Sequence, residues 1–205
     1  MNALTIQDLH FHYCPTRPIF SGVTLSFEAG KLHGIKGRNG SGKSTLFRLL
    51  MGELPHRGKI VCGAGAALVH QNFDKMIADQ FSFMDNVKLA SMGERPSFFR
   101  APKLRGQLPA FLERYGIDSD RPACLLSGGQ RQILALLMTL QKGPSLLLLD
   151  EPTAALDPKN AALFFDFVRE LIRERKITVI AVCHDHELIE RYADGKLLDM
   201  DALKK

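Results

Sequence analysis

The chain has 205 residues, 45% hydrophobic and 24% charged, which is ordinary for a globular protein and predicts a single domain over residues 1–205. The net charge of +5 comes from 27 basic and 22 acidic residues spread without a long basic run, so no nucleic-acid partner is expected. The four cysteines form no C-x-x-C pair, which argues against a zinc knuckle or a disulfide framework and fits reduced thiols in the cytoplasm. No apolar run approaches ~18 residues and no signal-peptide pattern opens the chain, so any membrane role is expected to be peripheral.

The N-terminal part of the chain alternates apolar and polar residues, as half-buried strands do. Residues 3–9 and 23–28 follow this pattern, and residues 31–36 predict a third strand after a turn at Ala29-Gly30. Tyr13 is placed in a Pro-rich connection between the first two strands. The third strand would deliver the chain into the glycine-rich segment that follows it.

That segment, residues 37–45, reads GRNGSGKST and matches the pattern G-x4-G-K-[ST]. Its glycines allow positive φ angles that turn backbone N–H groups inward, so the loop can form a concave nest for a polyphosphate. Residues 43–51 then begin a helix whose N-terminal amides face the same phosphates, and Lys43 adds a full positive charge. Ser44 is in position to ligate Mg²⁺. The alternative is a glycine-rich turn before a helix, with no ligand.

The middle of the chain changes from strands to helices. Residues 59–62 and 66–70 predict short strands that lead to Gln71. Residues 74–123 predict a small helical subdomain, with helices over 85–91 and 103–115. Within it, residues 98–100 read Phe-Phe-Arg and predict either an exposed apolar patch for a partner or two side chains packed under a helix.

The last third contains a strand, a helix and a second strand. Residues 145–149 are an unbroken apolar run, which is typical of a parallel strand covered on both faces, and residues 177–182 are another. Between them, Asp157-Pro158 supplies an N-cap and a proline at the first position of a helix. This βαβ unit predicts an α/β fold whose parallel sheet has helices on both faces.

Ligands of such sheets bind at the carboxyl ends of the strands. The chain places the glycine-rich loop, Asp150, Glu151 and His184 at those ends, which predicts one site from distant segments. The sequence LSGGQ at residues 126–130 precedes a predicted helix over 131–141, whose apolar residues follow helical spacing.

Together, the loop, Gln71, LSGGQ, the acidic pair and His184 resemble the ATP-binding cassette (ABC) ATPases over nearly the whole chain. LSGGQ is the specific element, since many nucleotide hydrolases share the loop and the aspartate. The resemblance implies a P-loop NTPase (RecA-like) core with an N-terminal antiparallel β region and an inserted helical subdomain. The core would comprise residues 1–73 and 124–205, and the subdomain residues 74–123.

The resemblance also implies a role for each site residue. The phosphates of ATP would be held by Gly37, Asn39, Gly40, Ser41, Gly42, Lys43, Ser44 and Thr45. Mg²⁺ would be held by Ser44, Asp150 and Gln71. Glu151 would be the catalytic base, with Gln71 sensing metal and water and His184 contacting the γ-phosphate. Tyr13 would stack on adenine.

By resemblance, the second glycine-rich turn acts on ATP bound by another subunit. Ser127, Gly128, Gly129 and Gln130 would contact the nucleotide of a second ATPase subunit placed head to tail, in a homodimer or heterodimer. Asp157 would communicate across the same interface.

Three functions remain open at this point. The first is the ATPase subunit of a transporter, on the cytoplasmic face of the membrane, driving an integral membrane permease on a separate chain through ATP-dependent dimerisation. The second is a soluble ABC ATPase of a non-transport machine, such as iron–sulfur cluster assembly. The third is an ATP-gated scaffold without hydrolysis, which the presence of Glu151 and His184 disfavours.

Overall fold

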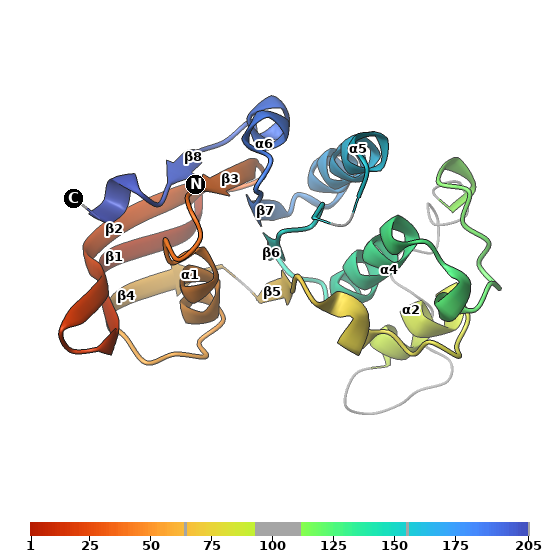
Figure 1. Ribbon diagram of the computed structural model, residues 1–205, viewed down its shortest axis with the longest axis horizontal. Coiled ribbons are helices and arrows are strands. Elements are labelled where there is room, and N and C mark those ends of the chain that lie inside the picture. Colours follow the sequence, from red (N-terminus) through yellow and green to blue (C-terminus); the bar gives the residue numbers. More distant parts are fainter. Residues whose placement is uncertain (64, 93–111, 155, 205) are drawn as a thin grey trace. The chain divides into compact units, whose positions relative to one another are not determined.

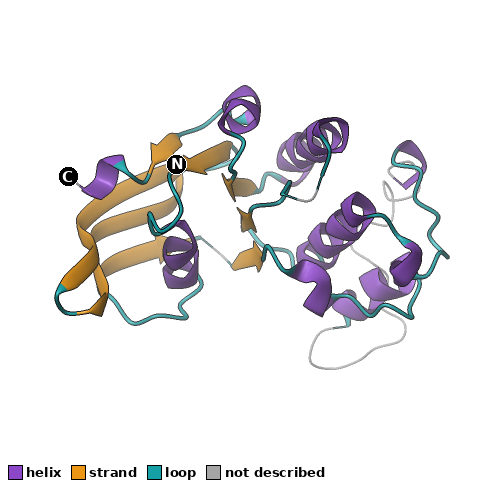
Figure 2. Cartoon of the chain, viewed as in Figure 1, coloured by secondary structure: helices purple, strands orange, loops and turns teal. Residues whose placement is uncertain are grey.

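The computed structural model describes residues 1–63, 65–92, 112–154 and 156–204, and the chain forms two compact units. The first unit comprises Met1–Gln71, Pro144–Ala154 and Ala162–Lys205, and the second comprises Asn72–Gly143 and Ala155–Ala161. Figure 2 shows the strands in the first unit, whereas the described part of the second consists of helices and loops. No helix among the described residues is long and apolar enough to cross a membrane.

The centre of the first unit is a parallel sheet of five strands in the order β5-β6-β7-β3-β8 (Figure 1). Leu146–Leu149 and Val179–Val182 are at most 1% exposed, so the two apolar runs are strands buried on both faces, as their composition predicts. The strands are β5 (Ala66–Val69), β6 (Leu146–Asp150), β7 (Thr178–Val182), β3 (Leu32–Lys36) and β8 (Leu197–Asp199).

Each helix of this unit follows a strand of the parallel sheet in the sequence. α1 (Lys43–Leu50) comes after β3 and the glycine-rich loop, and α5 (Pro158–Arg175) joins β6 to β7. α6 (His186–Tyr192) joins β7 to β8, and a short 3-10 turn, η3 (Ala202–Lys204), follows β8. The predicted βαβ unit and the α/β fold class are therefore confirmed.

A second, antiparallel sheet of three strands has the order β2-β1-β4. Its strands are β1 (Asn2–Cys14), β2 (Arg17–Glu28) and β4 (Arg57–Cys62), which appear side by side in Figure 1. Val23, Leu25 and Phe27 are buried while the residues between them are exposed, as the alternation predicts. This apolar face packs in one hydrophobic cluster with side chains of α1, including Leu46 and Phe47.

The predicted Pro-rich connection around Tyr13 is wrong. Tyr13 lies in β1, which continues to Cys14, and only Pro15 and Thr16 form the turn to β2. Pairing with β2 extends the strand beyond the short alternating segment visible in the sequence. Both strands are consequently longer than predicted.

The second unit is organised around two helices, α2 (Phe83–Ser91) and α4 (Gly128–Leu140). Two 3-10 turns, η1 (Phe73–Met76) and η2 (Ala123–Leu125), lie close to them in sequence. Residues 132–140 of α4 are buried on all sides, more completely than one apolar face would require. The Phe98-Phe99-Arg100 patch and residues 103–111 of the other predicted helix lie outside the described residues.

α4 begins three residues earlier than predicted. Ser127 is its N-cap, so Gly128, Gly129 and Gln130 form the first turn of the helix instead of preceding it. The cap compensates for the low helix propensity of two glycines. The Ser127 hydroxyl accepts from the N–H of Gln130, and the side-chain oxygen of Gln130 accepts from the N–H of Ser127.

A histidine of β3 is buried, and two backbone groups hold its ring. His33 is 1% exposed; its Nε2 donates to the carbonyl of Glu28 (2.8 Å), and its Nδ1 accepts from the N–H of Lys196 (2.7 Å). A side chain on Gly195 would place its Cβ 2.4 Å from this ring, so glycine is required there. The neutral imidazole therefore fits the site, and burial lowers the pKa of His33 below its ordinary value.

We expect acidification to destabilise the fold through His33. Because its pKa is lower in the folded chain, the unfolded chain binds more protons below pH ~6.5, and stability falls as the pH drops from there toward the folded pKa. The variant His33→Gln should be less stable than wild type at pH 7.5. Because glutamine cannot titrate, however, the variant should lose less free energy of unfolding between pH 7.5 and 5.5. Urea titrations at both pH values measure this difference, and equal losses in the two proteins would contradict it.

Candidate functional site

The glycine-rich loop joins β3 to α1 and takes a backbone shape that requires glycine. Gly37 has φ 148°, and a Cβ there would lie 2.8 Å from the hydroxyl of Ser41. Gly42 is the N-cap of α1 with φ 103°, in the left-handed region. The loop therefore delivers the chain into α1 with the backbone amides of its first turn unpaired within the helix.

Lys43 lies inside this loop. It is 7% exposed, and its Nζ donates to the carbonyls of Gly37 (2.7 Å) and Arg38 (3.1 Å). The hydroxyl of Ser41 is buried and has no hydrogen-bond partner among the described residues. A buried cation and an unsatisfied hydroxyl beside the unpaired amides at the start of α1 fit an oxyanion such as a phosphate.

Asp150 ends β6 close to the start of α1. Burial, followed by the charge of Glu151, raises its pKa, while His70, the Ser44 hydroxyl and Lys43 oppose that rise. A divalent cation would favour the charged carboxylate, and Asp150 and Ser44 offer the oxygen ligands that Mg²⁺ prefers. The donor set therefore fits Mg²⁺, although the described residues hold no group of three His, Cys, Asp or Glu side chains arranged for a metal ion.

Glu151 is held between two other predicted site residues. One carboxylate oxygen accepts from Nε2 of Gln71 (2.8 Å), and the other lies 2.6 Å from Nε2 of His184. Three strands supply this group, because Gln71 follows β5, Glu151 follows β6 and His184 follows β7. Adjacent parallel strands thus bring together residues that lie far apart in the sequence.

The backbone of Glu151 is unusual for a residue with a side chain. Its φ is 53°, in the left-handed region, which costs on the order of 1 kcal/mol for a non-glycine residue. Its N–H donates to the carbonyl of Val182 (3.0 Å), which ties this turn to the end of β7. The neighbouring strand thus fixes the strained residue in the position where its carboxylate meets Gln71 and His184.

A pocket of about 500 Å³ connects His184 with the glycine-rich loop. Its lining includes Gly37, Arg38 and Asn39 from the loop, with His184 and His186 from the end of β7 and the start of α6. His186 is exposed, as expected of a surface residue. The pocket places the half-exposed ring of His184 beside the loop's first three residues.

The sequence did not reveal a support beneath the loop. The N–H of Arg38 donates to Oδ2 of Asp201 (2.9 Å), and the N–H of Met200 donates to the carbonyl of Lys36 (2.9 Å). Met200 and Asp201 directly follow β8 and therefore contact the residues on both sides of Gly37. No local motif marks these residues, since the contact depends on the pairing of β8 with β3.

Tyr13 presents an accessible ring near the end of β1. It is 57% exposed, packs edge-on against Phe11 with ring centroids 4.8 Å apart, and its hydroxyl accepts from Arg48 of α1 (3.3 Å). An exposed aromatic face tethered to the helix that follows the loop is suited to stacking a planar base.

In the second unit, the LSGGQ turn is locked by contacts on both sides. Ser127 and Gln130 form the capping box, and Nε2 of Gln130 also donates to the carbonyl of Gly116 (3.2 Å). Arg131 then pairs with Asp74 (2.8 Å) and Asp79 (2.7 Å), which ties α4 to the segment after Gln71. No local motif marks these two contacts, which join residues more than fifty positions apart in the sequence.

Asp157 caps α5, as the Asp-Pro pair predicts. Its carboxylate accepts from the N–H of Asn160 (3.0 Å) and from that residue's side-chain amide, and these hydrogen bonds lower the pKa of Asp157. Asp157 is exposed, so its capping role leaves part of the side chain accessible.

The parallel sheet, the glycine-rich loop before α1 and the acidic end of β6 define a P-loop nucleotide-binding protein. Residues 20–154 match the family model described as ABC transporter. The chain belongs to the ABC transporter ATP-binding family, and its predicted membership and fold are confirmed.

Named relatives resemble the chain over most of its length. It is 32% identical to the methionine import ATP-binding protein MetN of Caulobacter vibrioides, with 93% of this chain and 62% of that protein covered. It is 33% identical to the phosphonates import ATP-binding protein PhnC of Alcaligenes faecalis, with 92% and 76% covered. The chain therefore spans less than two thirds of the first relative and about three quarters of the second.

A solved structure gives the same result for the fold. CbiO1 from Clostridium perfringens, described as part of the ABC transporter complex cbiONQ, superposes with a TM-score of 0.83 at 26% identity. The match covers 97% of this chain and 85% of that chain.

Proposed function

We propose that the chain is the ATP-binding and ATP-hydrolysing subunit of an ABC transporter. The observation that carries this proposal is Glu151, held by Gln71 and His184 and next in sequence to Asp150, in the unit that contains the phosphate loop. The relatives named above, an import ATP-binding protein in each case, support the transport role. Residues 74–123 would form the helical subdomain of the cassette.

Within the site, we assign binding to the loop and proton transfer to Glu151. The loop amides and Lys43 bind the β- and γ-phosphates of ATP, and Tyr13 stacks on adenine. Ser44, Asp150 and Gln71 hold Mg²⁺, which neutralises phosphate charge when bound. Glu151 accepts a proton from the attacking water, and His184 contacts the γ-phosphate.

The capped turn of α4 is proposed to bind the nucleotide of a second ATPase subunit. Gly128 and Gly129 present backbone N–H groups at the start of a thirteen-residue helix, where an anion is favoured, and Ser127 adds its hydroxyl, because its own N–H is already bonded to Gln130. Two subunits arranged head to tail would complete each other's sites, with Asp157 at the same interface. The dimer forms with ATP and opens after hydrolysis.

The permease is proposed to dock on the second unit from the cytoplasmic face of the membrane. Phe81 and Leu125 are large apolar side chains that are 47% and 57% exposed. Their segments are joined by the hydrogen bond from the N–H of Ala123 to the carbonyl of Phe81 (2.9 Å). Exposed apolar side chains on neighbouring segments suit a protein partner.

Replacing both docking residues tests the transporter role. We expect Phe81→Ser with Leu125→Ser to reduce recovery of the chain with a multi-spanning membrane protein about tenfold or more, because apolar anchors dominate such interfaces. Recovery is measured by tag pull-down from detergent-solubilised membranes and quantitative mass spectrometry of the bound chain, while the basal ATPase rate stays unchanged.

Val61→Ser is the matched control for this experiment, because Val61 is also 47% exposed but lies in β4 of the first unit. It should leave recovery unchanged. Equal loss in the control and the double variant would contradict docking on the second unit, and the absence of any membrane partner with wild type would contradict the transporter role.

A further inference from the structure

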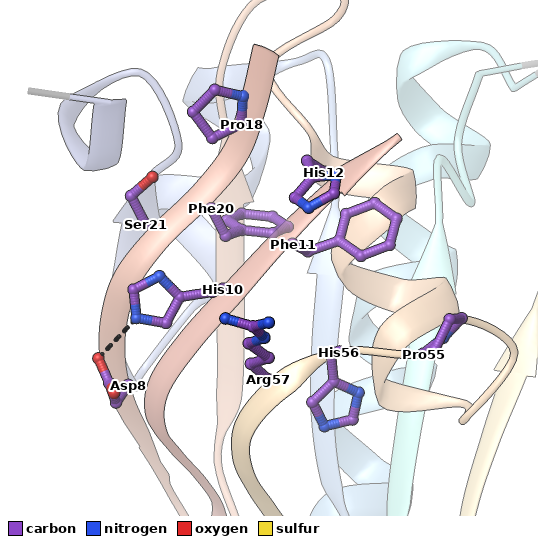
Figure 3. A pocket seen from close by; sticks show the side chains of 10 residues that line it. All are labelled: Asp8, His10, Phe11, His12, Pro18, Phe20, Ser21, Pro55, His56 and Arg57. Atoms are coloured by element: carbon purple, nitrogen blue, oxygen red, sulfur yellow. Dashed lines mark hydrogen bonds and ion pairs between the residues drawn. The ribbon is translucent and has the colours of Figure 1, made fainter. Parts of the chain in front are cut away.

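A groove of about 700 Å³ lies on the antiparallel sheet, and the proposed function does not use it (Figure 3). None of its lining residues belongs to the phosphate loop, to the group around Glu151 or to the LSGGQ turn. Its volume lies within the range of small-molecule sites. The lining residues are Asp8, His10, Phe11, His12, Pro18, Phe20, Ser21, Pro55, His56 and Arg57.

An irregularity in the strand pairing accompanies the groove. Asp8 has φ 50°, and the register between β1 and β4 shifts between Gln7 and His10. Gly58 faces this point with φ 97°, and a Cβ there would lie 2.2 Å from the carbonyl oxygen of Asp8, so only glycine fits. β4 begins at Arg57, opposite His10, and residues 55 and 56 precede it outside the sheet, so β1 extends past the start of β4.

The polar lining consists mainly of nitrogen groups that can donate hydrogen bonds. Arg57 is exposed and forms no ion pair with any described residue, and in Figure 3 its guanidinium extends toward the space between His10 and Phe11. His10, His12 and His56 contribute three imidazoles, of which that of His56 already has its Nδ1 3.4 Å from the carbonyl of Leu54. Asp8 is the one carboxylate in the lining, and its Oδ1 already lies 2.9 Å from Nε2 of His10.

The rest of the lining is apolar. Phe11 and Phe20 are 7% and 3% exposed, so their rings belong to the hydrophobic core and contribute only a small surface to the groove. Pro18 and Pro55 are the other apolar lining residues. A ligand in this groove would contact a cation and imidazoles at one part of its surface and rings at another.

Three histidines beside an aspartate could also suggest a metal site. However, the described residues include no group of three His, Cys, Asp or Glu side chains placed to hold one ion. The guanidinium of Arg57 would also repel a cation, whereas its planar fork matches an oxyanion. The geometry therefore favours an anion over a metal.

We propose that this groove binds a small organic oxyanion, with its carboxylate or phosphate on Arg57 and its apolar body against the aromatic and proline side chains. The ring N–H of His12 and the hydroxyl of Ser21 supply further hydrogen bonds, whereas His10 and His56 already donate to Asp8 and to the carbonyl of Leu54. Because His12 is adjacent to Tyr13 in β1, the ligand would occupy a position next to the strand residue proposed to stack on adenine.

Binding of benzoate and phenyl phosphate to the Lys43→Ala variant tests the groove, because that background weakens the phosphate loop. We expect saturable binding with dissociation constants on the order of 1 mM, as suits ligands of about ten non-hydrogen atoms, by saturation-transfer NMR. Benzyl alcohol, which is neutral, should bind at least tenfold more weakly. Whichever oxyanion binds more tightly identifies the preferred head group.

Arg57→Gln should weaken oxyanion binding at least tenfold, because it removes the charge but keeps a side chain that suits the strand. Lys59→Gln is the matched control, since Lys59 is an exposed cation two residues further along β4 and outside the lining. The control should bind as the parent does. Absence of saturable binding, equal binding of benzyl alcohol, or no effect of Arg57→Gln would each overturn the proposal, and none of these outcomes bears on ATP hydrolysis at Glu151.

Discussion

Glu151→Gln is expected to slow ATP hydrolysis by ~10²–10⁴-fold, the usual contribution of general-base catalysis. Glutamine preserves the local contacts, because its amide oxygen can accept from Gln71 and its NH₂ can donate to a neutral His184. It cannot accept the proton of the attacking water. Phosphate release under single-turnover conditions measures the rate, and a fluorescent ATP analogue should still bind with near wild-type affinity.

The same variant should trap the proposed dimer. With hydrolysis blocked, ATP persists between the phosphate loop of one subunit and the α4 turn of the other, and size-exclusion chromatography should shift from monomer to dimer. ADP should give no shift, and adding Ser127→Arg should abolish the shift with ATP. Full ATPase activity in Glu151→Gln would refute the assignment of the base.

Lys43→Ala should weaken MgATP binding by roughly ten- to a hundredfold. A hydrogen bond to a charged group contributes roughly 1.5–3 kcal/mol, and Lys43 is the buried cation of the loop. The two carbonyls that now accept from Nζ can turn to water, so the fold should survive. Titration with the fluorescent analogue measures the affinity, and circular dichroism checks the fold.

Lys31→Ala provides the control for this result. Lys31 is a partly exposed cation just before β3, paired with Glu28 and outside the phosphate loop. It should bind MgATP as wild type does. Wild-type affinity in Lys43→Ala would contradict the phosphate-loop assignment, whereas equal losses in both variants would indicate a general electrostatic effect.

Much of the fold was predictable because its strongest signals are local. The apolar runs that became β6 and β7 could be buried only by covering both faces, and Asp157-Pro158 marks a helix start through cap chemistry alone. The P-loop motif likewise specifies its backbone, since Gly37 and Gly42 adopt angles that other residues avoid. Such features can be predicted from the local sequence, without information about segments far along the chain.

Other features depend on contacts between distant segments and left no trace in the local sequence. β1 extends through Tyr13 because β2 pairs with it, and Asp201 reaches the N–H of Arg38 only because β8 lies beside β3. The start of α4 at Gly128 was missed because two glycines argue against a helix unless the Ser127–Gln130 cap is recognised.

The Ser127–Gln130 cap has a consequence for how tightly two subunits could associate. The oxygen of Ser127 accepts the Gln130 N–H, so its single proton is the part of the hydroxyl still available to donate outward. The turn is held by its own capping contacts and by the carbonyl of Gly116. A partner carrying ATP would therefore meet a preorganised surface, and association would lose little conformational entropy at Ser127, Gly128 and Gly129.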